Sequence, residues 1–457
     1  MRRYMFLLML AVVSAATAFP ADEGKDQPTL VNQARQALHK AGAYLSSIAT
    51  HGGYLWEYTV DLQQRWGEGK ATATQVWVQP PGTPAVGAAL LKAWQATGDE
   101  SLKAAAEAAG DALIWGQLEC GGWHYMIDFS PEAEKRWYYR HLKGREGLDT
   151  KRLRNSGTFD DNNTQSATSL LIALATATGE ERFAEAARYA LDYFLRAQYE
   201  NGGWPQWYPL VGRYHDYYTF NDAAINDIIR VLLEAWHAFG DEKYLQAAEK
   251  GGKFIVLSQG KPPQAAWAQQ YDMDLKPAWA RKFEPPSWCS AVTARNIRTL
   301  ITLYLETGKE EYLQPIPSAI EWLKASQLKG GEWARFYELG TNKPLYFTRD
   351  YKLTYSDADC PTHYSFKGNY GATSAMALYE RVRELGRQGY KEQMEAARSP
   401  EALRQRAQRL TQTIEGLVAS QDDAGRWVRG GRVKMQDFVH NLGLLAEYVQ
   451  GYGEKKQ

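Results

Sequence analysis

The sequence predicts an all-α fold, an α/α toroid (barrel) of about six helical hairpins with long loops that form a cleft at one rim. Three observations support this prediction. A Gln-x-x-x-Gly-x-Trp motif recurs along the chain, paired amphipathic helices precede its copies, and no Ser-, Pro- or Gly-rich linker divides the 457 residues. Hairpins that each carry one apolar face can bury it by closing into a ring of inner and outer helices.

The repeated motif has four complete copies and two degraded ones. The complete copies are Gln117/Gly121/Trp123, Gln198/Gly202/Trp204, Gln327/Gly331/Trp333 and Gln421/Gly425/Trp427. The degraded copies are Ile48/Gly52/Tyr54 and Gln259/Trp267. We expect a structural role for the motif, in which Trp stacks on Gln between adjacent hairpins and Gly permits the turn.

Helical periodicity predicts the hairpins individually. The predicted helix pairs are 83–97 with 101–117, 164–178 with 181–198, 222–239 with 242–259, 291–307 with 310–327, and 373–385 with 400–421, and the first helix is 32–47. Gly98, Gly179, Gly240 and Gly308 should end the first helix of their pairs in left-handed turns. The longer segments between hairpins, 125–159, 205–220, 268–290 and 334–369, should line the cleft.

The N-terminal segment has the pattern of a secretory signal. A basic start, an apolar run and the small residues Ala16-Thr17-Ala18 predict a signal peptide over residues 1–20 and a single catalytic domain over 21–457. Later segments contain no apolar run of about 18 residues, so we expect a secreted or periplasmic protein without a membrane span. The formal net charge of zero argues against binding to nucleic acid or membrane surfaces.

Two predicted helix starts carry similar acidic sequences. Asp160 and Asp161 precede one helix, and Asp222 begins another. The simplest interpretation is helix N-capping, for which Asp is well suited. Alternatively, neighbouring hairpins bring these carboxylates to one rim, where they share a divalent cation; calcium (Ca2+) suits such oxygen ligands.

Three stretches resemble the pectate lyases of polysaccharide lyase family 10, which fold as an α/α toroid. They read NGGWPQWYP, YTFNDAAIND and WARFYELGTNKPLYFTRD. The resemblance covers the region from Gly157 to Asp350 and implies β-elimination of polygalacturonate (pectate), an acidic plant-type polysaccharide. In that reaction a base removes the proton on carbon 5 of galacturonate and the oxygen on carbon 4 leaves. Neutralising the adjacent carboxylate acidifies the proton, so a cation such as calcium assists.

The resemblance also implies roles for individual residues. By motif, Arg281 matches the arginine base, Arg335 and Arg349 match uronate-binding arginines, and Arg298 matches a further basic residue. Asp160 or Asp161, with Asp222, matches the calcium- and substrate-side acids. Trp204 and Tyr208 lie in the first matching stretch and are expected to contact sugar. An arginine acts as a base only if its pKa is brought down, since an unperturbed guanidinium stays protonated.

The chain departs from the family pattern at two of these places. The family's Asp-Asn-Gly-Ala-Thr reads here Asp160-Asp161-Asn162-Asn163-Thr164, so either aspartate can be the ligand. The family's Arg-Asp-Gly reads Arg349-Asp350-Tyr351. The sequence therefore indicates a divergent member.

Two other functions fit the same fold. A glycoside hydrolase would need two carboxylates, for which Asp161 with Asp222, or Asp216 with Glu338, are candidates. A non-catalytic polysaccharide-binding protein would need only the aromatic and basic loops. One such loop, between Lys135 and Arg154, interleaves Arg and Lys with Trp and Tyr; a solvated loop is its simplest interpretation, and contact with a polyuronate is the alternative.

Overall fold

The computed structural model describes residues 27–453, and the predicted signal peptide lies outside this range. The described chain forms two compact units. The site unit contains residues 159–162 and 192–393, and the terminal unit contains residues 27–158, 163–191 and 394–453. The single domain predicted over residues 21–457 stays a prediction.

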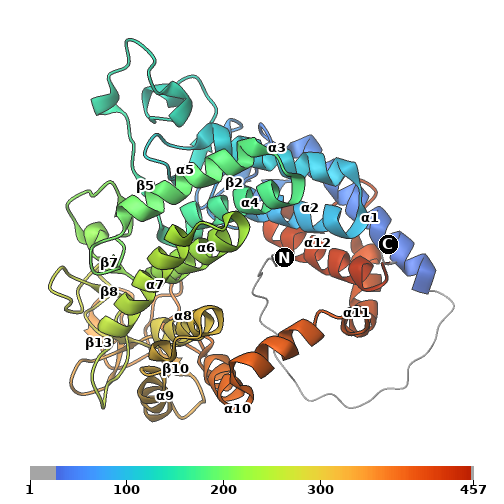
Figure 1. Ribbon diagram of the computed structural model, residues 1–457. Coiled ribbons are helices and arrows are strands. Elements are labelled where there is room, and N and C mark those ends of the chain that lie inside the picture. The colour runs from blue at the N-terminus through green and yellow to red at the C-terminus, as the bar shows by residue number, and fades with distance from the viewer. Residues whose placement is uncertain (1–26, 454–457) are drawn as a thin grey trace. The chain divides into compact units, whose positions relative to one another are not determined.

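Helices of the terminal unit pack in two rows (Figure 1). They are α1 (Gln27–Ile48), α2 (Thr83–Thr97), α3 (Glu100–Gly116), α4 (Asn163–Thr178), α11 (Pro400–Ser420) and α12 (Met435–Gly451). In one row α2 lies between α12 and α4, and in the other α1 lies between α11 and α3. α5 (Glu181–Ala197) runs from this unit into the site unit.

The two ends of the chain form one helix pair in the terminal unit. α12, which the sequence analysis missed, packs on α1. Nearby, β1 (Glu57–Thr59) pairs with β16 (Arg432–Lys434), with Tyr58 opposite Val433. The prediction missed α12 because it assigned helices only upstream of the Gln-Gly-Trp copies, and α12 follows the last copy.

The site unit has the same two-row packing. Its helices are α6 (Ala224–Phe239), α7 (Glu242–Leu257), α8 (Ser290–Thr307), α9 (Ile316–Ala325) and most of α10 (Ala372–Ala396). α6 contacts α8, and α7 and α9 also pack on α8. The predicted all-α class is confirmed by these helices. Closure of six hairpins into an α/α toroid stays a prediction.

Helix ends follow the predicted turn chemistry, with two adjustments. Gly98, Gly179, Gly240 and Gly308 all have left-handed φ, between 70° and 78°. The helix predicted over 310–327 begins only at Ile316, because the flanking prolines lack the N–H that an α-helix interior needs. α10 extends past the predicted end at residue 385 through a non-helical Gly386.

The Gln-Gly-Trp motif holds the end of the second helix in a hairpin. Gln198 Nε2 donates to the carbonyls of Gly202 (3.1 Å) and Ala247 (3.0 Å), and Gly202 has φ 98°. Trp204 Nε1 donates to the Phe194 carbonyl at 2.8 Å. The Gln-to-Gly and Trp-to-helix bonds recur in the copies at Gln117, Gln327 and Gln421. The structural role is confirmed through these hydrogen bonds, and the stacking of Trp on Gln stays a prediction.

Short strands join the long loops of the site unit. β7 (Tyr218–Thr219) pairs with β8 (Gln270–Tyr271), and β10 (Trp333–Ala334) pairs with β14 (Lys367–Gly368). A four-stranded sheet has the order β13 (Leu353–Thr354), β12 (Pro344–Phe347), β11 (Phe336–Tyr337), β9 (Trp288–Cys289). Three of the four loops predicted to line the cleft are thus tied together, while the fourth, 125–158, belongs to the terminal unit.

The remaining strands are short as well. They are β2 (Arg65–Trp66), β3 (Gln75–Trp77), β4 (Met126–Asp128), β5 (Gly157–Thr158) and β15 (Val428–Arg429) in the terminal unit, and β6 (Trp207–Tyr208) in the site unit. Among the described helices, none combines the length and apolar character that crossing a bilayer demands.

Candidate active site

Two helix starts in the site unit share an uncommon backbone conformation. One is η4 (Asp160–Asn162), and the other is η6 (Asn221–Ala223), directly before α6. Asp161 and Asp222 have φ values of 47° and 44°, and the residue after each is also left-handed. Residues with a Cβ adopt this region at a cost, and such strain persists where surrounding structure fixes it, often at functional sites. The two starts that look alike in sequence therefore fold alike.

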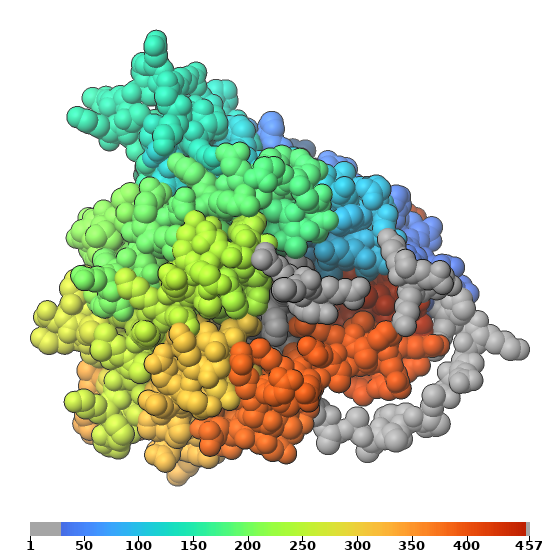
Figure 2. Space-filling view, in the orientation of Figure 1, coloured from blue at the N-terminus to red at the C-terminus, as the bar shows by residue number. Residues whose placement is uncertain are grey.

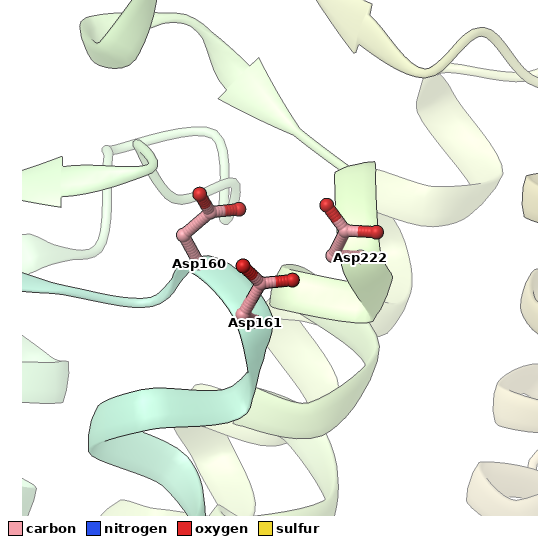
Figure 3. Close-up of side chains that lie close together, drawn as sticks. All are labelled: Asp160, Asp161 and Asp222. Carbon is pink, nitrogen blue, oxygen red and sulfur yellow. The ribbon is translucent and has the colours of Figure 1, made fainter. Parts of the chain in front are cut away.

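The carboxylates of Asp160, Asp161 and Asp222 come together at these starts. One oxygen from each lies within 4.8 Å of the others, and the three side chains point toward a shared space (Figure 3). α6 begins without a side-chain capping bond, so the capping interpretation does not hold for Asp222. Three carboxylate oxygens at this spacing fit a hard divalent cation such as calcium.

The charge of Asp222 is opposed by its surroundings. Burial raises the pKa of its carboxyl, and Asp160 raises it further; Arg335, Arg281 and Arg295 act in the opposite direction. The net pKa lies above the ordinary value of 3.8. A carboxylate that is costly to ionise alone gains from a bound cation, which favours its charged form.

Arg281 is clamped by a glutamate on its own turn. Its Nε donates to Glu284 Oε2 at 2.9 Å and its Nη2 to Glu284 Oε1 at 2.6 Å. Burial lowers the pKa of Arg281, but the hydrogen bonds and charge of Glu284 outweigh burial, so the net pKa lies above its ordinary value. The remaining nitrogen, Nη1, is the part of the fork that Glu284 does not engage.

Glu284 is a buried carboxylate with several hydrogen-bond partners. Its side chain is 1% exposed, against 43% for Arg281. Besides Arg281, it accepts hydrogen bonds from Gln269 Nε2 (2.7 Å) and from the Tyr364 hydroxyl (3.3 Å). A buried carboxylate with these partners is fixed in position, and it fixes Arg281 in turn.

Arg335 lies among aromatic rings beside Tyr364. Its Cζ is 4.4 Å from the centroid of Tyr364 and 6.0 Å from that of Tyr370. Its Nε donates to Gln269 Oε1 at 3.4 Å. The rings attract the cationic guanidinium, and arginine is the side chain that can grip a carboxylate with two parallel hydrogen bonds.

Several members of this cluster were missed by the sequence analysis. They are Gln269, Arg295, Tyr214 and Tyr364. The charge of Arg295 lowers the pKa of the Asp222 carboxyl. The charge of Arg281 lowers the pKa of the Tyr214 hydroxyl, and the charges of Glu284 and Asp160 raise it. Arg295 lies one helical turn before Arg298 on α8, and helical spacing alone does not tell which of the two faces the site. Tyr364 carried no motif that could have indicated it.

Two predicted arginines lie in other surroundings. Arg298 donates to the carbonyl of Gly371 and to the hydroxyl of Ser374 at the start of α10, a structural arrangement. Arg349 has a side chain that is 72% exposed, with its Nε 3.5 Å from Asp359 Oδ1. Arg349 is thus reachable by a ligand, whereas Arg298 is committed to the packing of α8 on α10.

The prediction for Trp204 is wrong, and that for Tyr208 remains open. Trp204 is 0% exposed and gives its indole N–H to the helix carbonyl described above, so neither ring face can reach a sugar. Its aromatic character serves the repeat motif. Tyr208, in β6, is half-buried and packs edge-on against Tyr193.

The carboxylates Asp216 and Glu338, proposed for a hydrolase, serve their own turns. Asp216 accepts from the backbone N–H groups of Val211 (2.8 Å) and Gly212 (2.7 Å). Glu338 accepts from the Tyr355 hydroxyl at 2.6 Å and from Thr341. These contacts give both carboxylates a local structural role.

The basic loop of the terminal unit is largely neutralised within its own unit. It protrudes in teal in Figure 2 and includes the cations Arg136, Arg140, Lys143, Arg145, Lys151 and Arg152. Four of them pair with acids: Arg140 with Glu185, Lys143 with Glu119, Arg145 with Glu134 and Arg152 with Asp149. These pairs favour the simpler interpretation, a solvated loop.

Residues 129–332 match the family model described as pectic acid lyase. This segment of the chain is similar to pectic acid lyases. The match includes the three aspartates and Arg281 and ends before Arg335. It confirms the family recognised from the motifs and the prediction that the chain is a lyase. The pectic acid lyase segment covers less than half of the 457 residues.

Solved structures give further similarities. A mutant of the family 10 polysaccharide lyase from Cellvibrio cellulosa, in complex with trigalaturonic acid, is 24% identical, with a TM-score of 0.49, over 60% of this chain and 92% of that one. A second structure of the family 10 polysaccharide lyase from Cellvibrio cellulosa is 24% identical, with a TM-score of 0.48, over 60% of this chain and 91% of that one. An α-mannanase of Bacteroides thetaiotaomicron is 11% identical, with a TM-score of 0.46, over 93% of this chain and 96% of that one. A comparison with curated proteins finds no match.

Proposed function

We propose that this protein cleaves polygalacturonate by β-elimination, with calcium bound by Asp160, Asp161 and Asp222 and with Arg281 as the base. The observation that carries the proposal is the gathering of these three carboxylates with Arg281, Arg335 and Arg295, whose charges all act on Asp222. Acidic and basic groups together suit a cation and a polyanion bound side by side. The pectic acid lyase match over residues 129–332 supports the same activity.

Arg335 and Arg349 are the proposed uronate-binding arginines. Arg335 presents a guanidinium braced on Tyr364, and Arg349 presents an exposed one. Each offers the planar fork that a sugar carboxylate accepts. Tyr208 belongs to the same unit and is half-buried. It is the proposed aromatic contact to a sugar face.

Calcium, when bound, neutralises a uronate carboxylate and so acidifies the neighbouring carbon-bound proton. The three aspartates would hold the ion through their carboxylate oxygens. Their strained helix starts fix the carboxylates before the ion arrives, which lowers the cost of ordering them at binding.

The proton on carbon 5 passes to Arg281 while the bond between carbon 4 and the glycosidic oxygen breaks. The electron pair of the broken C–H bond forms the new double bond, and the leaving oxygen takes a proton from water. Arg281 can accept only when its guanidinium has lost a proton, and Glu284 opposes that loss. The proposed base therefore works at alkaline pH, and Nη1 is the nitrogen that faces the substrate.

Activity on polygalacturonate, measured with calcium and then with excess chelator, tests the proposal. A lyase generates a conjugated product that absorbs in the ultraviolet, and a hydrolase does not. Arg281→Ala should abolish that product while substrate still binds. Reducing sugar released without ultraviolet absorbance would favour the hydrolase, and binding without any product would favour a non-catalytic protein.

The protein is also proposed to act outside the cytoplasm, either secreted or in the periplasm. The secretory pattern over residues 1–20 supports this location. N-terminal sequencing of the mature protein recovered from medium or periplasm should begin near residue 21. Recovery of the full-length chain from the cytoplasm alone would contradict export.

A further inference from the structure

Tyr351 occupies the turn between β12 and β13 in a conformation that favours glycine. Its φ is 60°, in the left-handed region, and its N–H donates to the Thr348 carbonyl at 2.8 Å. The Thr348 hydroxyl oxygen accepts the Lys352 N–H at 3.1 Å, which closes the turn. The left-handed conformation is unfavourable for a tyrosine, so contacts of the Tyr351 side chain must compensate for the conformational free energy.

The Tyr351 ring packs on the turn that bears Arg281, about seventy residues earlier in the chain. Its centroid lies 5.5 Å from that of Phe283, with the rings 28° apart, and the ammonium of Lys282 lies 3.6 Å from its centroid. His363 packs edge-on against both rings, at 5.9 Å from Tyr351 and 5.5 Å from Phe283. We call Phe283, Tyr351 and His363 the aromatic latch. Ring stacking and a cation over a ring face are both attractive contacts.

Each half of the latch carries an arginine of the proposed site. Phe283 is buried, and the Arg281 Cζ lies 4.9 Å from its ring centroid. Arg349 lies two residues before Tyr351 on the turn between β12 and β13. The sheet fixes the base of this hairpin through β11 and β12, but the latch is what joins its tip to the Arg281 turn.

We propose that Tyr351 is a positioning residue that docks the β12–β13 turn onto the Arg281 turn and so sets the spacing between Arg281 and Arg349 for a polyuronate. The inference rests on the proposed function, since it assigns both arginines to one acidic substrate. Lys282, held over Tyr351, adds a cation to that of Arg349 on the same surface. Cations at a fixed distance from the base suit a chain with a carboxylate on successive sugars, and a neutral glycan gains nothing from them.

Three variants separate this role from a folding role. Y351G removes the ring and relieves the backbone conformation, Y351A removes the ring alone, and Y351F keeps the ring. Y355A is the matched control, because Tyr355 belongs to the same hairpin and bonds to Glu338. Hydrogen exchange of the peptides covering 281–284 and 348–352, and kcat and KM on polygalacturonate with calcium, are measured for each full-length variant.

The latch predicts faster exchange in both peptides for Y351G and Y351A, together with a fall of about tenfold in kcat/KM that comes mainly from KM. Y351F should match the unsubstituted protein in both measurements. Y351G should melt no lower than the unsubstituted protein, so its loss of kcat/KM would not reflect unfolding.

Two results would overturn the proposal. Unchanged exchange over 281–284 in Y351G and Y351A would show that Tyr351 does not hold the Arg281 turn. Faster exchange with an unchanged KM would show that the latch does not position the arginines for substrate. If the unsubstituted protein made no unsaturated product, the proposed function would fail, and exchange would still decide whether Tyr351 joins the two turns.

Discussion

The guanidinium of Arg281 is held on the carboxylate of Glu284 by two hydrogen bonds, of 2.9 and 2.6 Å. This pair gives the proposed base a fixed orientation and, at the same time, makes it harder to deprotonate. Orientation favours proton transfer, because a base must lie within hydrogen-bond reach of the proton it removes. The raised pKa disfavours it at neutral pH. The two effects can be separated by changing Glu284.

Glu284→Gln should move the pH dependence of kcat. Glu284 raises the pKa of Arg281 against the lowering effect of burial, so its removal brings that pKa down. The neutral guanidine fraction grows as pH rises through the pKa, and the alkaline rise in kcat should therefore shift to lower pH. The lost ion pair, which is fully present at neutral pH, should cost roughly 1–3 kcal/mol of unfolding free energy. Rate against pH and thermal melting check both statements.

Glu338→Gln is the control for this experiment, since the Glu338 carboxylate bonds to Tyr355 and Thr341. It should leave the pH profile in place. A uniform loss of kcat in Glu284→Gln, with the profile unmoved, would mean that Arg281 acts as a fixed cation and that another group accepts the proton.

Asp222→Asn should abolish calcium binding while stabilising the calcium-free protein. The folded-state pKa of Asp222 is raised, mainly by burial and then by Asp160. Its contribution to stability is therefore fully present below the unfolded pKa and is lost as pH rises through the folded one. A neutral asparagine avoids that loss at pH 7. Calorimetric titration and melting with and without calcium measure both effects.

Calcium affinity of the unsubstituted protein should fall as pH drops through the Asp222 pKa, because protons then compete for the ligand. Saturating calcium at about 100 times its Kd should add roughly 2.7 kcal/mol of stability. Asp274→Asn, in an exposed turn with Lys276, is the matched control. An equal calcium-induced rise in melting temperature for Asp222→Asn would remove Asp222 from the ligand set.

Most helices of this fold could be predicted from sequence because their signals are local. Apolar periodicity, left-handed glycines and the Gln-Gly-Trp copies each act within one hairpin, and they located α2 to within a residue. α12 was missed because it follows the last Gln-Gly-Trp copy, where no further copy marks the end of a hairpin; it packs on α1, at the opposite end of the described chain. α9, which begins beside Pro315, and α10, which continues through Gly386, differ from the predicted helices at their ends.

The site was less predictable because its parts depend on side-chain direction. The similar helix starts indicated Asp160, Asp161 and Asp222, which do come together. Trp204 was assigned to substrate because aromatic residues suit both cores and sugars, and only its burial decides between them. Similarly, Arg295 and Arg298 differ by one helical turn, and the rotation of α8 decides which one acts on Asp222.

Arg335→Lys should raise KM for polygalacturonate about tenfold or more, because lysine offers a point charge without the planar fork that grips a carboxylate. Lysine also loses the flat contact with Tyr364. Arg298→Lys is the control, since Arg298 bonds to Gly371 and Ser374. Steady-state kinetics at two salt concentrations measure the change. An effect on KM for Arg298→Lys equal to that of Arg335→Lys would restore the predicted substrate role of Arg298.

Trp204→Phe should lower stability without changing KM. The indole N–H bonds to the Phe194 carbonyl at 2.8 Å, and the ring packs against α7, where a Cβ on Gly251 would come within 2.7 Å of it. Phenylalanine leaves that carbonyl unpaired and a cavity beside α7, at a cost of roughly 2–4 kcal/mol. Trp279→Phe, at a tryptophan that is 47% exposed, should leave the melting temperature nearly unchanged. A raised KM in Trp204→Phe at a temperature where it stays folded would contradict the buried role, because a ring sealed between α5 and α7 can affect substrate only by unfolding the motif that it holds.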